Sequence, residues 1–386
     1  MLASKSLQAP IRPAPIRVPG LSRGHSLLVT AAQRKPSFHL QPPGGWTNDP
    51  NGVHYDAKTK LYHMFYQHHP TSAVWSWGLS WGHAVSEDLV HWSHLPPALD
   101  PTPEGPDAGG VWSGCAFPTD EGTVLLHTAV RKRDETPESK LPPAELDLGH
   151  QVIESQQYAV SQPEKDPFLR NWEKGEKPLL PLPPQGGLTG WRDPFLVGRP
   201  GDGLHDKYTI IIGSGYMDDE KKEPSRGAVF VYTSDDPISG WKYEGELCHG
   251  DGSTGAVWEC PLLARVENHP HYKGEAGPMQ HILVVCPDNP HNTPVYFLGR
   301  YDPKTLKFDM ENASGPHPVD LGGGPLGSTF YAPNGSHLCI SGKKLCDSGK
   351  PPVHFRKGTV HLLSREGHGA VSDPWQGHLI PLRCCV

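Results

Sequence analysis

The run Trp46-Thr47-Asn48-Asp49-Pro50-Asn51-Gly52 holds one carboxylate inside a segment that is dense in turn-forming residues. Pro50 fixes its own φ and pushes Asp49 toward an extended conformation, while Asn51 and Gly52 permit positive φ. A carboxylate held rigidly among aromatic and amide side chains suits a nucleophile that acts on a sugar. The alternative is a plain hairpin turn with an exposed aspartate.

Two further motifs place a carboxylate beside tryptophan or arginine and shortly before proline. They are Trp191-Arg192-Asp193-Pro194-Phe195 and Trp258-Glu259-Cys260-Pro261. Retaining cleavage of a glycoside needs an ionised nucleophile and, about 5–5.5 Å away, a protonated carboxyl that releases the leaving oxygen. We expect Trp258 to exclude water around Glu259 and so favour its protonated form, and Arg192 to keep Asp193 ionised. The alternatives are a local ion pair for Arg192 and Asp193 and an ordinary surface acid for Glu259.

Apolar residues alternate along the chain with a period of two, which predicts strands rather than helices. A hairpin is expected from residues 53–55 and 61–67. Further strands are expected over residues 80–86, 111–117, 123–130, 156–161, 208–213, 228–233, 256–263, 281–286 and 295–301. Many short strands between Gly/Pro turns predict an all-β sandwich, barrel or propeller. The stretches 86–92 and 234–241 both end in Trp and resemble the close of a repeated blade, whereas residues 131–149 and 218–225 are expected to be exposed loops.

The composition limits the partners. The chain of 386 residues has 43 Gly and 43 Pro and carries a net charge of −7, with 36% hydrophobic residues. Six of its 35 Lys and Arg residues lie in residues 1–37, which leaves 29 against 42 acidic residues in the rest. An acidic body without a basic stripe argues against nucleic acid or an anionic membrane as partner, and no apolar run approaches the ~20 residues of a membrane span. The His and Cys spacings suggest no metal site, and no cofactor is expected.

The first 37 residues have the composition of a targeting segment. They are rich in Ser, Ala, Pro and Arg and contain no acid, since the first acidic residue is Asp49. We interpret residues 1–37 as a cleaved transit peptide and predict a chloroplast or other plastid location. A secretory signal and a disordered leader are the alternatives, and the glycosylation triplets at Asn312 and Asn334 keep a secreted or vacuolar location open.

Together, these motifs resemble those of glycoside hydrolase family 32, the invertases, inulinases and related β-fructofuranosidases. The family's Trp-x-Asn-Asp-Pro-Asn-Gly, Arg-Asp-Pro and Glu-Cys motifs occur here in the family's order, and supporting stretches extend the similarity over residues 38–333. The resemblance implies an all-β, five-bladed β-propeller over residues 38–386 with an axial pocket. Residues 334–372 diverge from the family, and we expect its C-terminal β-sandwich to be missing, which leaves the completeness of the last blade open.

The resemblance also implies roles for single residues. Asp49 corresponds to the nucleophile, Glu259 to the general acid and base, and Asp193 to a carboxylate that binds ring hydroxyls and stabilises the transition state. The predicted substrate-binding residues are Asn48, Gln67, Trp77, Trp112, Ser113 and Arg192. Trp81 is expected to be structural.

The function implied is a retaining β-fructofuranosidase that hydrolyses the terminal fructosyl unit of sucrose by double displacement. A fructan hydrolase or a fructosyltransferase of the same family is an alternative, as are an inactive carbohydrate-binding relative and an arabinan-cleaving five-bladed enzyme. Two departures from the family pattern bear on substrate choice: Leu262 stands where the family usually has Asp, and Asp320 aligns only loosely with a late sugar-binding position. The oligomeric state stays open.

Overall fold

The computed structural model describes residues 40–120, 122–161, 166–218, 220, 223–266, 273–274, 277–278, 281–288, 294–319, 330–335 and 363–366. The predicted transit peptide, Asp320 and most of the divergent segment 334–372 lie outside these residues. In the described part no helix is long and apolar enough to cross a membrane. The chain divides into residues 1–39 and residues 40–386, and only the second unit contains described residues.

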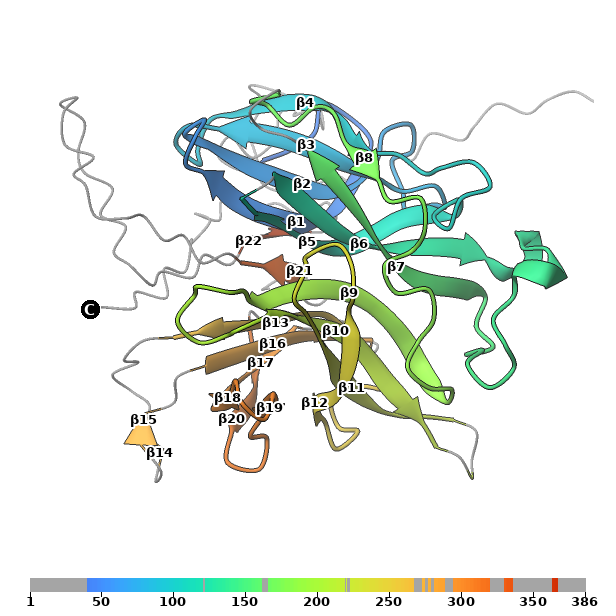
Figure 1. Ribbon diagram of the computed structural model, residues 1–386, viewed down its shortest axis with the longest axis vertical. Helices are drawn as coiled ribbons and strands as arrows, with labels where there is room; N and C mark the ends of the chain where they lie inside the picture. The colour runs from blue at the N-terminus through green and yellow to red at the C-terminus, as the bar shows by residue number, and fades with distance from the viewer. Residues whose placement is uncertain are drawn as a thin grey trace, which may run out of the picture. The chain divides into compact units, whose positions relative to one another are not determined.

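The described chain folds into four-stranded antiparallel sheets, each in simple chain order (Figure 1). The first blade is β1 (Trp46–Asp56), β2 (Leu61–His69), β3 (Ser80–Ser86) and β4 (Trp92–Leu99). The second is β5 (Gly110–Pro118), β6 (Thr123–Lys132), β7 (Val152–Ser161) and β8 (Glu173–Lys174). The third is β9 (Leu188–Gly198), β10 (Tyr208–Met217), β11 (Pro224–Ser234) and β12 (Lys242–His249). The fourth is β13 (Trp258–Arg265), β16 (His281–Pro287), β17 (Val295–Gly299) and β20 (Ser314–Pro318).

Three two-stranded pairs complete the described strands. They are β14 (Lys273–Gly274) with β15 (Gly277–Pro278), β18 (Tyr301–Asp302) with β19 (Lys307–Phe308), and β21 (Phe330–Asn334) with β22 (Leu363–Glu366). Two short 3-10 turns, Arg133–Glu135 and Glu138–Lys140, lie in the predicted loop 131–149. The stretches 86–92 and 234–241 occupy equivalent places in two blades. Each forms the turn before the last strand of its blade, however, and does not end the blade as predicted.

The first strands of the blades lie side by side around an axis. β1 contacts β5, β5 contacts β9, and β9 contacts β13, while β21 contacts both β1 and β13. Figure 1 shows the β21–β22 pair between the first and fourth blades. This radial repetition confirms the predicted all-β propeller. The prediction of five blades is not met: the described residues hold four complete blades, and the fifth place holds only a two-stranded sheet. Most of the sequence after Asn334 lies outside the described residues.

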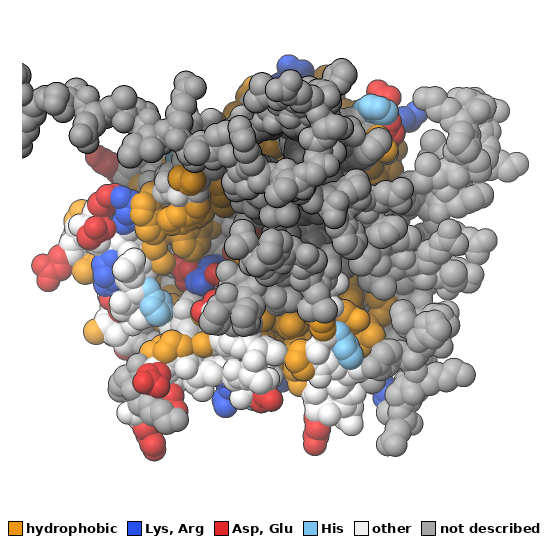
Figure 2. Space-filling model, turned by 180° about the vertical axis from the view of Figure 1, so that it is seen from behind, with side chains coloured by type: hydrophobic (Ala, Val, Ile, Leu, Met, Phe, Trp, Pro, Cys, Tyr) orange, Lys and Arg blue, Asp and Glu red, His pale blue; other side chains and the backbone are white. Residues whose placement is uncertain are grey.

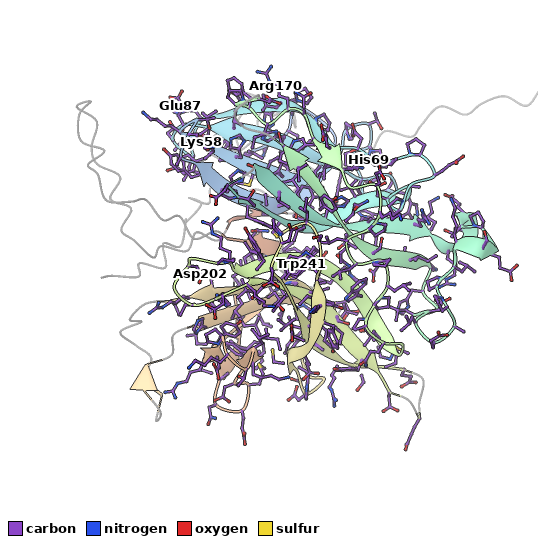
Figure 3. All side chains as sticks on the ribbon, in the orientation of Figure 1. Lys58, His69, Glu87, Arg170, Asp202 and Trp241 are labelled. Atoms are coloured by element: carbon purple, nitrogen blue, oxygen red, sulfur yellow. The ribbon has the colours of Figure 1, made fainter. Side chains whose placement is uncertain are left out.

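Figure 3 shows the side chains of the described residues on the ribbon, and those between neighbouring blades form apolar clusters. Phe117 and Leu126 of the second blade pack with Trp191 and Phe230 of the third. The next interface holds Trp258, which is fully buried in one cluster with Val229 and Phe297. Trp81 is also fully buried, as predicted for a structural residue.

Every inner strand carries a bulge at the same level. The pairing register skips at Asp49 in β1, at Trp112 and Ser113 in β5, and at the residue before proline in β9, β13 and β21. The skipped residues that precede proline all have positive φ, and they are Asp49 (27°), Asp193 (64°), Cys260 (45°) and Ala332 (51°). The prediction of an extended Asp49 in a turn is therefore wrong, because the bulge of a strand sets its backbone. Such non-glycine conformations cost about 1–3 kcal/mol each and cluster at functional sites.

Candidate active site

The three predicted carboxylates lie on three of the five inner strands, β1, β9 and β13, of which β9 and β13 are neighbours. The thiol of Cys260 lies 3.8 Å from Asp49 Oδ2 and 3.5 Å from Asp193 Oδ2. The backbone N–H of Cys260 donates to the same Asp193 oxygen at 2.8 Å. Glu259 precedes Cys260 on β13, so all three carboxylates converge around one residue.

Asp49 is held by a single close donor. The Ser113 hydroxyl donates to Asp49 Oδ2 at 2.6 Å from the neighbouring strand β5. Burial raises the pKa of Asp49 to about 6, and the charge of Glu259 adds to this rise, whereas hydrogen bonds from Ser113 and Cys260 oppose it. Asp49 is therefore ionised at neutral pH but close to its titration range.

The pKa of Asp193 is raised further than that of Asp49. Burial raises its pKa to about 7; the charge of Arg192 opposes the rise, and the charges of Glu259 and Asp49 add to it. Its N–H donates to Thr128 Oγ1 at 2.8 Å, which fixes the bulge from β6. The charge of Arg192 favours the ionised form of Asp193, as predicted, but burial outweighs it, and the guanidinium pairs with Glu154 and Glu259.

Glu259 is bound on both of its carboxylate oxygens. Arg192 donates to Glu259 Oε1 from Nη2 at 2.8 Å and from Nε at 3.1 Å. The Tyr331 hydroxyl of β21 donates a short hydrogen bond to Glu259 Oε2. The expected shielding of Glu259 by Trp258 is not what the structure shows, because the Trp258 indole is buried in the core and donates to Thr254 Oγ1 at 3.1 Å.

Arg192 connects Glu259 to a second glutamate. Its Nη1 donates to Glu154 Oε1 at 2.7 Å. Burial acts against its charge, but the carboxylates of Glu154 and Glu259 outweigh this and raise the pKa of Arg192, so that it stays cationic. Arg192 is thus shared by two carboxylates.

The predicted sugar-binding side chains lie on the first two blades. Asn48 is opposite Gln67 in the β1–β2 ladder, so their side chains are neighbours. Gln67 is buried and donates to Val111 O at 3.0 Å, and within the described part its Oε1 has no hydrogen-bond partner. The rings of Trp77 and Trp112 stack with centroids 6.3 Å apart, and Trp112 adjoins Ser113. Trp112 is thus one residue away from Ser113, which binds Asp49.

A small hollow continues from the carboxylates along the axis. It is lined by residues of all five inner strands, among them Pro50, Gly114, Phe195, Leu262 and Asn334. Leu262, which replaces the family's usual Asp, is buried against Ile282 and Val284. The hollow shows that β21 completes the ring around the axis.

Sequence reasoning missed three residues that hold the site. Thr128 binds the backbone of Asp193, Glu154 binds Arg192, and Tyr331 binds Glu259. Thr128 and Glu154 lie in alternating strand sequence without a motif, and only the contact of β6 and β7 with β9 gives them a role. The sequence could have indicated Tyr331, because it stands two residues before Pro333 just as Arg192 stands two residues before Pro194. Among the described residues, no group of three or more His, Cys, Asp or Glu side chains is arranged to hold a metal ion.

Comparison with known proteins agrees with this architecture. The chain is 34% identical to "Beta-fructofuranosidase 1" of Zea mays over 327 residues, which covers 78% of this chain and 43% of that protein. It is 33% identical over 296 residues to "Acid beta-fructofuranosidase 2, vacuolar" of a Rosa hybrid cultivar, covering 75% of this chain and 40% of that protein. Fructan 1-exohydrolase IIa of Cichorium intybus, solved in complex with 1-kestose, matches with 27% identity and a TM-score of 0.59, over 85% of this chain and 52% of that one.

The propeller is thus a fold that this chain shares with a solved fructan 1-exohydrolase. Residues 39–356 match the model of the glycosyl hydrolases family 32 N-terminal domain, and the chain belongs to glycoside hydrolase family 32. The chain spans about half the length of the relatives it matches.

Proposed function

We propose that this chain carries the catalytic propeller of a retaining β-fructofuranosidase that hydrolyses the terminal non-reducing β-fructofuranosyl unit of sucrose. One observation supports this most directly. Asp49, Asp193 and Glu259 converge around Cys260, with Glu259 bound by a cation and a phenol and with Asp49 bound by a hydroxyl. This arrangement gives the three carboxyl groups three different environments, as a double displacement requires.

In the proposed reaction, Asp49 attacks the anomeric carbon of fructose. Ser113 and Cys260 hold Asp49 Oδ2, so the attack falls to Oδ1. As the carbon–oxygen bond to glucose breaks, the protonated Glu259 gives its proton to the departing oxygen. Glu259 then takes a proton from water, whose oxygen displaces Asp49 and releases fructose with retained configuration. Asp193 would bind ring hydroxyls and stabilise the transition state.

The neighbouring side chains suit the sugar. Asn48 and Gln67 offer amide groups to fructose hydroxyls, while the indoles of Trp77 and Trp112 offer apolar faces. Ser113 acts through Asp49. Arg192, predicted to bind substrate, has its guanidinium occupied by Glu154 and Glu259. We therefore propose that Arg192 binds Glu259 and influences its protonation, rather than binding substrate.

We further propose that β21 and β22 belong to the fifth blade of the family's propeller. The Ala332-Pro333 bulge of β21 repeats those of β1, β9 and β13, and β21 contacts the strands on both sides. On this basis the fifth blade supplies Tyr331 to the site.

Two related activities and another location remain to be distinguished by experiment. The Cichorium relative is named as a fructan exohydrolase, which favours a fructan as the second candidate substrate, and transfer to a sugar acceptor is the third. An inactive carbohydrate-binding protein and an arabinan-cleaving enzyme are further alternatives. The name of the Rosa relative favours a vacuolar or secreted location, and the plastid location predicted from residues 1–37 gains no support from these relatives.

The test is release of fructose from sucrose, raffinose and inulin by the purified protein. We expect Asp49→Asn to lower kcat on sucrose at least about 1000-fold, because the covalent step is lost. Asp235→Asn, which changes an exposed acid of the third blade, is the matched control and should keep wild-type activity. Folded wild-type protein that releases no fructose from any of the three sugars would refute the proposal.

A further inference from the structure

Glu154 is a buried acid that the proposed reaction does not use. It lies on β7, the third strand of the second blade, and its side chain is only 3% exposed. Its Oε1 accepts from Arg192 Nη1 at 2.7 Å and its Oε2 accepts from the N–H of Trp191 at 2.7 Å. A buried carboxylate with both oxygens satisfied by β9 is fixed in one position.

Glu154, Arg192 and Glu259 form one chain of ion pairs. Arg192 binds Glu154 through Nη1 and binds Glu259 through Nη2 and Nε. The Arg192 side chain is 14% exposed, so water screens these contacts weakly. One positive charge therefore serves two carboxylates, and the group carries a net negative charge when both are ionised.

The pairing of Arg192 with two carboxylates affects whether Glu259 is protonated. A guanidinium that paired with Glu259 alone would strongly favour the ionised carboxylate. Tyr331, which donates to Glu259 Oε2, acts in the same direction. The proposed reaction needs Glu259 protonated before the bond to the leaving group breaks. A second negative charge near Arg192 would weaken its attraction for the Glu259 carboxylate. Glu154 is the other carboxylate in contact with Arg192.

We propose that Glu154 is a positioning residue that takes up part of the charge of Arg192 and thereby lets Glu259 hold its proton at working pH. This inference rests on the proposed function of Glu259 as general acid. The remaining titratable groups around Glu259 are Asp49, Asp193, Cys260, Cys286 and Tyr331, whereas the partners of Glu154 are Arg192 and the N–H of Trp191.

The test compares the pH dependence of kcat/KM for sucrose in the wild type and in Glu154→Gln. The amide keeps the shape of the side chain but removes its charge, so Arg192 turns more fully to Glu259. We expect the alkaline limb of the profile to move to lower pH by about one unit, with activity above that limb reduced about tenfold. An unchanged limb, or a move to higher pH, would overturn the inference.

Asp107→Asn is the matched control. Asp107 is a buried carboxylate that pairs with Lys174 on the outer strand of the second blade, so its loss costs stability without touching Arg192. The alkaline limb of the kcat/KM profile of Asp107→Asn should coincide with that of the wild type. An equal displacement in this variant would show that general loosening of the blade is the cause, and the inference would fail.

A readout without activity separates this inference from the proposed function. Carbon-13 NMR of the glutamate carboxyl groups follows the protonation of Glu259 directly, and Glu259→Gln identifies its signal. We expect the titration midpoint of this signal to fall in Glu154→Gln, whether or not the protein cleaves sucrose. A midpoint that does not move contradicts the role of Glu154, whereas a moved midpoint in a protein that releases no fructose contradicts only the enzymatic proposal.

Discussion

The ionisation of Asp49 depends on two opposing local effects. Burial raises its pKa to about 6, and the hydrogen bond from Ser113 is the largest effect in the other direction. A nucleophile must be ionised, so activity should fall as the pH drops through the pKa of Asp49. At the residue scale, Ser113 therefore sets how far into acid the site can work.

Replacement of Ser113 tests this balance. In Ser113→Ala the hydroxyl that stabilises the Asp49 carboxylate is lost, so the pKa of Asp49 rises further above 6. We expect the acid limb of kcat/KM to move to higher pH by about one unit, so that activity falls about tenfold at pH 5 and much less at pH 7.5. Ser113→Thr keeps the hydroxyl and should keep the limb in place. A uniform loss at all pH values would instead indicate a steric effect.

Sequence motifs marked the three carboxylates of the candidate site but not the side chains that bind them. Asp49, Asp193 and Glu259 each stand beside proline or cysteine in a motif, so local sequence marked them. The partner of Arg192 could not be found in this way, because it depends on how β7, β9 and β13 pack. Local reasoning paired Arg192 with its neighbour Asp193, whereas three-dimensional packing pairs it with Glu154 and Glu259.

At the scale of the element, the inner-strand bulge is the unit that repeats. Each bulge turns one residue toward the axis, and the proline that follows in four of the strands limits the conformations of the bulged residue. In β5 the bulge ends at Gly114 instead. A Cβ at Gly114 would lie 1.9 Å from the carbonyl oxygen of Leu126 on β6, so only glycine lets these strands meet.

Gly114→Ala therefore tests the bulge of β5. The added methyl group must push β5 away from β6, and we expect a loss of about 2–3 kcal/mol in the free energy of unfolding. Ser113 moves with β5, so fructose release should fall as well. Urea unfolding measures the first effect. Gly44→Ala is the control, because a Cβ there meets no atom within 4 Å. Equal stability of Gly114→Ala and the wild type would contradict the close approach.

At the scale of the whole molecule, the sequence predicted the class of fold better than the number of blades. Alternating apolar residues and Gly/Pro turns recur through residues 40–319, and the four complete blades follow from them. The fifth place could not be predicted in the same way, because residues 334–372 diverge from the family's sequence pattern. Its occupant β21 is recognised by its bulge and by its contacts with β1 and β13, both of which require the folded ring. On the face seen in Figure 2, the described Lys and Arg side chains are scattered among acidic ones rather than gathered in one patch.

The stability of the whole molecule should depend on pH through buried histidines of the first blade. His54, His63 and His83 lie on β1, β2 and β3, and their rings stack with centroids 5.0 and 5.3 Å apart. Burial lowers the pKa of His54 to about 4, although Gly52 O and Asp56 oppose this. Burial and mutual repulsion also lower the pKa values of His63 and His83. All three are therefore neutral in the folded protein at pH 7.

The sign of the effect follows from the lowered pKa values. The unfolded chain takes up protons below pH 6.5 while the folded chain resists them, so stability is full above 6.5 and is lost as the pH falls toward 4. At pH 5, His54 alone costs about 2 kcal/mol. The raised pKa values of Asp49 and Asp193 act in the opposite direction, because acid relieves the cost of burying their charges.

A double variant separates the two effects. His63→Phe with His83→Phe keeps aromatic rings in the stack and removes two titrating groups together with the hydrogen bond that joins them. Urea unfolding at pH 7.5 and pH 5 should show a smaller loss of stability in acid for this variant than for the wild type. His91→Phe, at an exposed position, should behave as the wild type does. If the double variant loses as much stability in acid as the wild type, His63 and His83 are not the cause of that loss.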